Sequence, residues 1–139
     1  MTTRRRMIFG LALLPVAGLA VMPLSHRAQA ETIVTQAMTV DQMRANGGLI
    51  VDIRRPEEWA ETGVIDGARL VTFDGAEQFL AELGPEIASG RDLILVCRSG
   101  RRTAAAAEAL AGRIPNRIIS VDGGMISVVN GGYSPVPAP

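Results

Sequence analysis

Cys97 is the only cysteine in this 139-residue chain, and charged residues crowd it on one side. An apolar run, residues 93–96, comes directly before it, and three arginines follow within five positions: Arg98, Arg101 and Arg102. Nearby cations favour the ionised form of a thiol, which is the form that acts as a nucleophile. A cysteine with only a packing role gains nothing from clustered cations. The spacing therefore predicts a reactive thiolate that works on a negatively charged substrate.

The residue types that are missing exclude several kinds of site. The chain has no lysine, and its single histidine, His26, lies near the N-terminus. A histidine-activated nucleophile or a histidine-ligated metal is therefore excluded for the rest of the chain. One cysteine allows neither an internal disulfide nor a CxxC redox pair. The thiol must be activated by its surroundings alone, and the sequence indicates no metal site and no cofactor.

Residues 1–30 have the pattern of an export signal. Three arginines at 4–6 precede an apolar stretch at 7–24, and Ala-Gln-Ala at 28–30 has the small-x-small form of a signal-peptidase site. Residues 3–8 also resemble the twin-arginine export pattern, although ordinary signal peptides share these features. The sequence thus predicts export to the periplasm. Because an apolar stretch of about 18 residues can also span a bilayer, an uncleaved anchor in the inner membrane, facing the periplasm, is the alternative.

The remaining residues, 31–139, are enough for one domain with its own core. Four of the 14 basic residues precede position 31, whereas all 14 acidic residues follow it, so this domain has a net charge of −4. A nucleic-acid-binding domain needs a basic surface, which excludes that class of partner. The proline-rich end, residues 133–139, is expected to be extended.

Apolar runs and helix signals alternate along this domain. Short apolar runs bounded by turn residues predict buried strands, and cap signatures with glycine or proline stops delimit the helices. The expected strands are at 31–36, 49–53, 68–73, 93–96 and 117–121, and the expected helices at 39–45, 56–62, 74–83 and 103–112. Such alternation predicts an α/β fold in which helices flank both faces of a central parallel sheet.

The predicted fold places Cys97 where ligands bind. In an open α/β sheet, binding sites lie beyond the carboxyl ends of the strands, and Cys97 directly follows the most apolar strand. A tight loop before the helix at 103–112 would point backbone N–H groups at the thiol, and the helix N-terminus would add positive charge. The residues expected to bind substrate are Arg98, Ser99, Gly100, Arg101, Arg102 and Thr103.

Several other residues are expected to have structural roles. Asp52 and Arg54 lie two residues apart at a strand end and should pair with each other. Trp59 and Phe73 are large apolar side chains that we expect in the core. The glycine pair at 123–124 should form a tight turn near the cysteine loop.

Residues 97–103, C-R-S-G-R-R-T, resemble the active-site loop of the rhodanese, or sulfurtransferase, superfamily, whose common form is C-R-S-G-x-R-S/T. Two further blocks are similar. Asp-Ile-Arg at 52–54 and Pro-Glu-Glu at 56–58 stand where the family has D-x-R and P-E-E, and residues 121–136 resemble its closing block of a glycine pair, a short helix and a Gly-Tyr-Pro end. Because three blocks occur in the right order over residues 36–136, the domain is identified as a member of this superfamily.

The resemblance implies sulfane-sulfur transfer through Cys97. The thiolate would attack the outer sulfur of an anionic donor such as thiosulfate, become a persulfide, and pass that sulfur to a thiol or to cyanide. Arg98 and Arg102 occupy the family's own arginine positions, so they are expected to meet the donor more directly than Arg101. The chain departs from the family at three points: Val64 replaces a histidine, Val128 replaces a tryptophan, and Ser134 is inserted before the final proline.

Two other functions are alternatives. Cysteine phosphatases and arsenate reductases of the same fold use C-x5-R, whereas the sixth residue after Cys97 here is Thr103 and the nearest arginine is Arg102. The shorter loop favours a sulfur atom over a phosphate group. A persulfide carrier that serves a partner protein would use the same cysteine and loop, and the sequence does not separate it from a freely acting enzyme.

Overall fold

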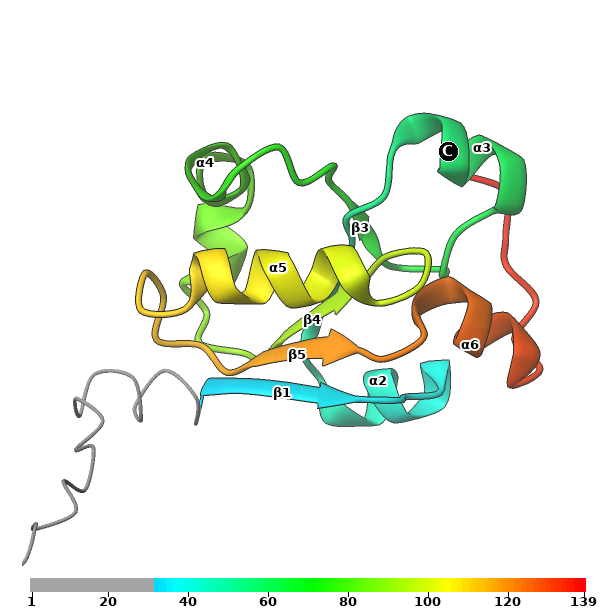
Figure 1. The fold of residues 1–139 in the computed structure, drawn as a ribbon, viewed down its shortest axis with the longest axis horizontal. Helices are drawn as coiled ribbons and strands as arrows, with labels where there is room; N and C mark the ends of the chain where they lie inside the picture. The colour runs from blue at the N-terminus through cyan, green and yellow to red at the C-terminus, as the bar shows by residue number, and fades with distance from the viewer. Residues whose placement is uncertain (1–31) are drawn as a thin grey trace, which may run out of the picture.

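A parallel sheet of five strands organises residues 32–139, which the computed structural model describes (Figure 1). In spatial order the strands are β1 (Ile33–Gln36), β5 (Ile118–Val121), β4 (Leu93–Val96), β2 (Leu49–Asp52) and β3 (Arg69–Leu70). Every neighbouring pair is parallel. β4 and β5 are buried along their whole length, as central strands of a sheet covered on both faces must be. The predicted α/β fold with a central parallel sheet is confirmed.

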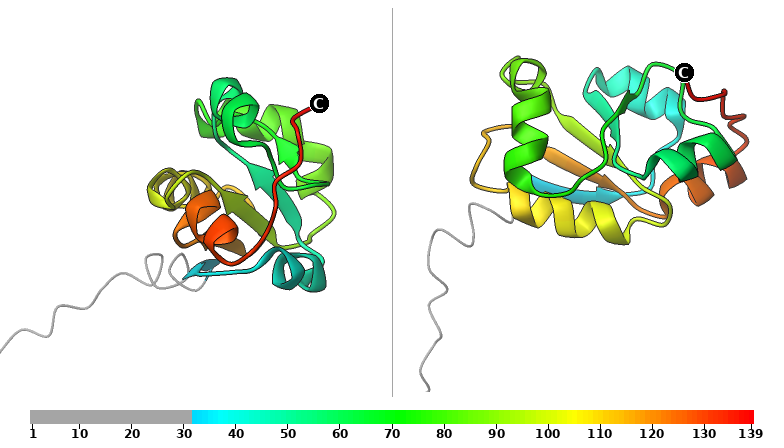
Figure 2. Two further views of the ribbon diagram at one scale, coloured as in Figure 1. Left: turned by 90° about the vertical axis from the view of Figure 1, so that its right-hand side faces the viewer. Right: turned by 90° about the horizontal axis from the view of Figure 1, so that it is seen from above.

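Helices cover both faces of this sheet. α4 (Ala76–Ile87) and α5 (Arg101–Leu110) pack on one face, and α2 (Val40–Asn46) and α6 (Gly124–Asn130) pack on the other. The hydrophobic core is accordingly divided into two clusters, one under each pair of helices. α3 (Pro56–Thr62) has no buried residue and lies beside the C-terminal end of the chain (Figures 1 and 2).

The two-residue period of β4 decides where Cys97 points. Side chains alternate between the two faces of a strand, so Leu93 and Leu95 belong to the cluster under α4 and α5, whereas Ile94 and Val96 belong to the opposite cluster. Cys97 continues the odd-numbered series and joins the first cluster. Its side chain is therefore directed to the face on which α5 begins.

Local signals begin and end α2 and α3 as predicted. Thr39 caps α2 through a capping box, in which its Oγ1 accepts from the Gln42 N–H and its own N–H donates to Gln42 Oε1. Pro56 begins α3, at a position where its missing N–H is not needed. Gly63 ends the same helix.

α4 extends past its predicted end. The sequence predicts a stop at Gly84-Pro85, but the helix continues to Ile87. Phe79, Leu83 and Ile87 lie four residues apart and are all buried on one face of the helix. The burial of Ile87 in the last turn outweighs the backbone hydrogen bond that Pro85 does not make.

β3 is shorter than predicted. The expected strand at 68–73 is reduced to Arg69–Leu70, because regular pairing ends where β2 ends, at Asp52. Beyond it the segment keeps hydrogen bonds from the Val71 N–H to the Asp52 carbonyl and from the Phe73 N–H to the Ile53 carbonyl. The next predicted cap also differs. Asp74 does not cap α4, and its N–H instead donates to Gln78 Oε1.

α5 begins earlier than predicted, at Arg101 instead of residue 103. Gly100 has a φ of 93°, and its carbonyl accepts the Ala104 N–H as the first hydrogen bond of the helix. Glycine adopts this left-handed conformation without strain, so the chain turns directly from the loop into the helix. Arg101 and Arg102 consequently lie in the first helical turn and not in a free loop.

The two aromatic residues predicted for the core behave differently. Phe73 is partly buried, packs against the cluster under α4 and α5, and contacts the Phe79 ring. Trp59 is only half-buried and belongs to neither cluster. The prediction for Trp59 is wrong because its helix, α3, has no face on the sheet.

The predicted export signal at 1–30 lies outside the described residues, as does its alternative, a membrane anchor. Within residues 32–139, no helix combines the length and the apolar character needed to cross a membrane. The leader therefore stays a prediction.

Candidate active site

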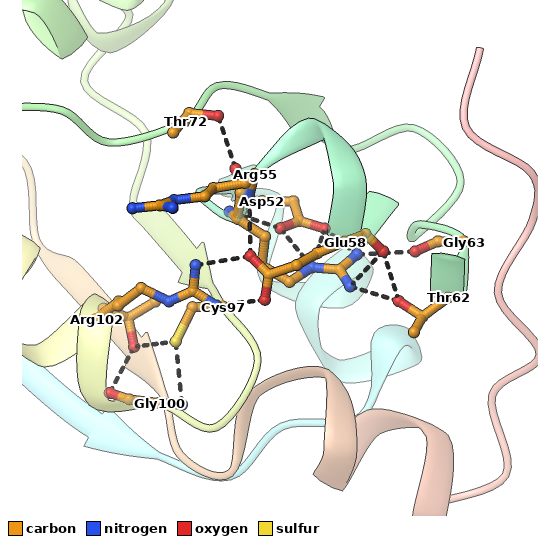
Figure 3. Close-up of polar contacts among 11 residues, drawn as sticks. Asp52, Arg55, Glu58, Thr62, Gly63, Thr72, Cys97, Gly100 and Arg102 are labelled. Atoms are coloured by element: carbon orange, nitrogen blue, oxygen red, sulfur yellow. Dashed lines mark hydrogen bonds and ion pairs between the residues drawn. The ribbon is translucent and has the colours of Figure 1, made fainter. Parts of the chain in front are cut away.

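The Cys97 sulfur faces the turn that leads into α5 (Figure 3). The Gly100 N–H donates to Sγ over 3.1 Å, and Thr103 Oγ1 lies 3.8 Å from the same sulfur. Cys97 has no exposed surface. It nevertheless lies at the edge of the core, against the loop backbone, where an N–H group aimed at the sulfur stabilises negative charge on it.

A pair of buried hydroxyl groups supports this loop from inside. Thr103 Oγ1 donates to the Gly100 carbonyl over 2.9 Å and accepts from Ser120 Oγ over 2.8 Å. Both hydroxyl groups thus have the partners that burial requires. Ser120 is absent from the sequence-predicted site residues. A single hydroxyl within the apolar strand β5 is the signal that could have indicated it.

The start of α6 holds the loop from the opposite side. The Met125 N–H donates to the Cys97 carbonyl over 2.8 Å, and the Ile126 N–H donates to the Arg98 carbonyl over 3.2 Å. A Cβ at Gly124 would overlap the Cys97 carbonyl oxygen and would lie 2.6 Å from the Arg98 carbonyl carbon. The glycine pair therefore forms the predicted tight turn near the loop, and it permits this close backbone approach.

Arg102 is engaged by a carboxylate that the sequence did not indicate. Its Nη1 and Nη2 donate to the two Glu58 carboxylate oxygens over 2.8 and 2.6 Å (Figure 3). This hydrogen bonding lowers the pKa of Glu58 from its ordinary value of 4.5 to about 2, and Glu58 in turn raises the pKa of Arg102. The pair joins α3 to the first turn of α5 and compensates the charge of one of the three loop arginines.

The other two arginines of the loop differ from Arg102. Arg98 and Arg101 are exposed, and among residues 32–139 neither guanidinium has an ion-pair or hydrogen-bond partner. Ser99 is exposed between them. The structure therefore divides the predicted substrate-binding residues into two groups. Gly100 and Thr103 adjoin the sulfur. Arg98, Ser99 and Arg101 form an exposed loop rim that carries two positive charges.

Asp52 and Arg54 form the structural pair that the sequence predicts. Arg54 Nη2 lies 2.7 Å from Asp52 Oδ2, and Nε donates to both carboxylate oxygens. The remaining donors reach the Thr62 hydroxyl and the Gly63 carbonyl over 2.6 and 2.8 Å. Because both residues are buried and their polar atoms are bonded, the pair fixes the end of β2 to the end of α3.

Comparison with known proteins places this site in a family. Residues 36–134 match the rhodanese-like domain family, and the chain therefore belongs to that family. Over 83 residues it is 32% identical to a thiosulfate sulfurtransferase, GlpE, of Ectopseudomonas mendocina, an alignment that covers 60% of this chain and 72% of the relative. Together, the family and this relative support a sulfurtransferase-type function.

Solved structures share the fold. A protein of unknown function from Rhodopseudomonas palustris, described as a possible tyrosine phosphatase, is similar over 91% of this chain and 99% of its own, with a TM-score of 0.58 and 20% identity. A rhodanese-related protein from Thermoplasma volcanium is similar over 70% of this chain and 94% of its own, with a TM-score of 0.51 and 23% identity. At these identities, the likeness concerns the fold alone.

Proposed function

We propose that the protein transfers sulfane sulfur from an anionic donor of the thiosulfate class to a thiophilic acceptor, through a persulfide on Cys97. The observation that carries this proposal is the Gly100 N–H directed at the Cys97 sulfur in the turn before α5. A nucleophile that has no histidine nearby depends on such surroundings for its ionised form. The sulfurtransferase relative supports the reaction class.

In the loading step, the Cys97 thiolate attacks the outer sulfur of the donor. A bond forms between Sγ and that sulfur, the sulfur–sulfur bond of thiosulfate breaks, and its electron pair leaves with sulfite. The outer sulfur of the resulting persulfide carries negative charge about 2 Å beyond Sγ. Loop N–H groups and the N-terminus of α5 would stabilise that charge.

In the unloading step, an acceptor nucleophile attacks the outer sulfur. Cyanide would leave as thiocyanate and a thiol would leave as a persulfide, and in both cases the electron pair of the broken bond returns to Cys97 as thiolate. The cycle is redox-neutral overall and needs no cofactor. It also needs no second cysteine, which agrees with the single cysteine of the chain.

The two free arginines would attract the donor. Arg98 and Arg101 are exposed at the loop and have no partner within residues 32–139, and exposed cations raise the local concentration of an anionic substrate. Arg102 is already compensated by Glu58, so its contact with the donor would require it to share or leave that partner. We therefore assign donor attraction to Arg98 and Arg101 and a positioning role to Arg102.

The test is cyanide-dependent release of thiocyanate from thiosulfate, measured for the wild type and for Cys97→Ser. The wild type should turn over, and the variant should show no activity above the uncatalysed reaction. Intact mass measured after incubation with thiosulfate should show one added sulfur atom, removable by cyanide, only in the wild type. Equal thiocyanate release by both proteins would overturn the proposal.

A persulfide carrier is the second candidate function, because Cys97 has no exposed surface and a buried sulfur limits which acceptors reach it. Carrier and enzyme differ in turnover: a carrier would load from thiosulfate once and release little thiocyanate in steady state. Phosphatase chemistry is less well supported, since the guanidinium of Arg102 is held by Glu58. Failure to hydrolyse p-nitrophenyl phosphate would agree with this ranking.

We further propose that residues 1–30 direct export and that the domain works in the periplasm. The support is the leader's sequence pattern alone. The N-terminal sequence of protein recovered from the producing cells tests this proposal: a chain that begins at Glu31 supports cleavage, and a chain that begins at Met1 in the membrane fraction supports the anchored alternative.

A further inference from the structure

A groove opens beside the cysteine loop, between α3, α6 and the C-terminal segment. Its volume is about 390 Å³, which is within the range of sites that bind organic ligands. Both apolar and charged side chains line it. The lining residues that matter here are Arg98, Glu61, Met125, Ile126, Val129 and Pro135.

The floor of this groove is the main exposed apolar surface of the described residues. Ile126 is 49% exposed and Val129 is 44% exposed, and both line the groove. The one other large apolar side chain exposed between residues 32 and 139 is Val136, which does not line it. Apolar side chains that gather at a concave site indicate a binding surface.

The groove is continuous with the active-site loop. The Ile126 N–H donates to the Arg98 carbonyl, so the first turn of α6 and the loop share a border. Arg98 itself lines the groove one residue after Cys97. A ligand lying on Ile126 and Val129 would therefore end at the edge of the cysteine loop, beside Arg98.

The charges of the groove are separated. Arg98 is a free cation at the loop end, and Glu61, on α3, is exposed without an ion-pair partner among the described residues. The other charged lining residues are neutralised, Arg54 by Asp52 and Glu58 by Arg102. The groove thus complements a ligand that is negative where it meets Arg98 at the loop, apolar where it lies on Ile126 and Val129, and positive where it meets Glu61.

Neither the proposed donor nor cyanide has this chemistry. Thiosulfate is a small dianion that gains nothing from an apolar floor, and cyanide occupies only a small part of 390 Å³. A cysteine-bearing polypeptide segment does match it, since its thiolate would lie near Arg98 and its apolar side chains on Ile126 and Val129.

We propose that this groove docks the sulfur acceptor, a polypeptide segment in which a cysteine is followed by apolar residues and then by a lysine or arginine that pairs with Glu61. This inference rests on the proposed persulfide on Cys97. The acceptor thiolate attacks the outer sulfur, a new sulfur–sulfur bond forms on the acceptor, and the bond to Sγ breaks with its electron pair on Cys97. No oxidant or reductant is consumed.

The experiment uses protein loaded with thiosulfate and then freed of it. Two synthetic peptides serve as acceptors, Cys-Leu-Val-Ala-Lys and Cys-Ser-Gly-Ser-Glu, each blocked at both ends. Mass spectrometry follows the persulfide that appears on each peptide, and cyanide treatment of a parallel sample measures how much sulfur the protein carried. The apolar, basic peptide should accept sulfur about tenfold faster, since it buries an aliphatic side chain that the polar peptide lacks.

Variants locate the effect in the groove. Val129→Ser should lower transfer to the apolar peptide about tenfold and leave thiocyanate release unchanged. Val136→Ser, which changes an equally large exposed side chain outside the groove, should change neither rate. Glu61→Lys, a substitution at an exposed residue, should slow transfer to the peptide that ends in lysine, while the part of the preference that comes from its apolar residues remains.

Each outcome decides one point. Equal rates for both peptides, or a Val129→Ser rate equal to the wild-type rate, overturns the groove proposal while cyanide still releases thiocyanate. If a small apolar thiol such as 2-phenylethanethiol accepts sulfur as fast as the apolar peptide, the proposal that the acceptor is a polypeptide is overturned. If cyanide releases no thiocyanate from the loaded wild type, Cys97 carries no persulfide, and the proposed function and the docking proposal are both overturned.

Discussion

The carboxyl ends of β2 and β4 are neighbours in the sheet, and each carries a charged cluster, but the two clusters differ in how completely their polar groups are bonded. At the end of β2, Arg54 is 2% exposed and every nitrogen of its guanidinium has an acceptor. At the end of β4, the Cys97 sulfur accepts one backbone N–H, and the nearby Arg98 and Arg101 have no partner among the described residues.

This difference distinguishes a structural cluster from a candidate chemical site. A buried charge is tolerated when its partner and hydrogen bonds are complete, and such a cluster has no capacity left for a ligand. Uncommitted donors and cations at a strand end are available to a substrate. The sequence blocks 52–54 and 97–103 both belong to the family resemblance, yet only the second has free groups.

If the β2 cluster is structural, breaking it should cost stability more than any change at the loop rim. Arg54→Met leaves the Asp52 carboxylate buried without its cation, and we expect a loss of about 3–5 kcal/mol in the free energy of unfolding. Urea unfolding measures this loss. The matched change Arg98→Met, at an exposed arginine without a partner in the described part of the chain, should alter stability by about 0.5 kcal/mol or less. Similar losses for both variants would remove the distinction.

The loop backbone should be the next most sensitive feature. Gly124→Ala places a Cβ against the Cys97 carbonyl and strains a residue whose φ is 54°, so we expect a loss of about 1–3 kcal/mol and reduced thiocyanate release. Gly47→Ala is the control, because Gly47 has a φ of 74° but open space around the added Cβ. It should lose stability without losing activity per folded molecule. If Gly124→Ala and Gly47→Ala lose the same activity per folded molecule, the close approach of Gly124 to the loop backbone has no specific role in activity.

The free and the compensated arginine of the loop should differ in catalysis. Arg98→Gln is expected to lower kcat/KM for thiosulfate about tenfold at low ionic strength, and added salt should reduce this difference. Arg102→Gln should have a smaller and less salt-dependent effect, since Glu58 already compensates that charge. Steady-state rates at two salt concentrations test this ordering. A larger, salt-sensitive loss at Arg102 would reverse the assigned roles.

The smallest expected effect concerns the Glu58–Arg102 pair and acid. Because the pKa of Glu58 is lowered to about 2 in the folded protein from an ordinary 4.5, its contribution to stability is present above pH 4.5 and is lost as the pH falls toward 2. The pair is partly exposed, so we expect at most about 1 kcal/mol. Glu58→Gln should flatten this part of the stability curve, measured by urea unfolding at several pH values. Glu61→Gln, on the same helix without an arginine partner, should leave the acid slope unchanged.

Much of the fold follows from short stretches of sequence. The apolar runs predict β2, β4 and β5 within a residue or two, and cap signals begin α2 and α3 correctly, because burial pattern and capping act between neighbours in the chain. The errors lie where distant residues decide. α4 continues beyond Pro85 because Ile87 is buried in the core, and β3 is short because its regular pairing with β2 ends at Asp52.

The same distinction between local and distant effects applies to the candidate site. Residue types and spacing alone predict Cys97 and its loop as the site, and show that no histidine follows His26 in the chain. They could not indicate that Glu58 binds Arg102, that Ser120 supports Thr103 from β5, or that α6 and the C-terminal segment form an apolar groove at the loop. Local geometry is encoded within a few residues, whereas charge compensation and surface shape arise only when strands and helices far apart in the chain are packed side by side.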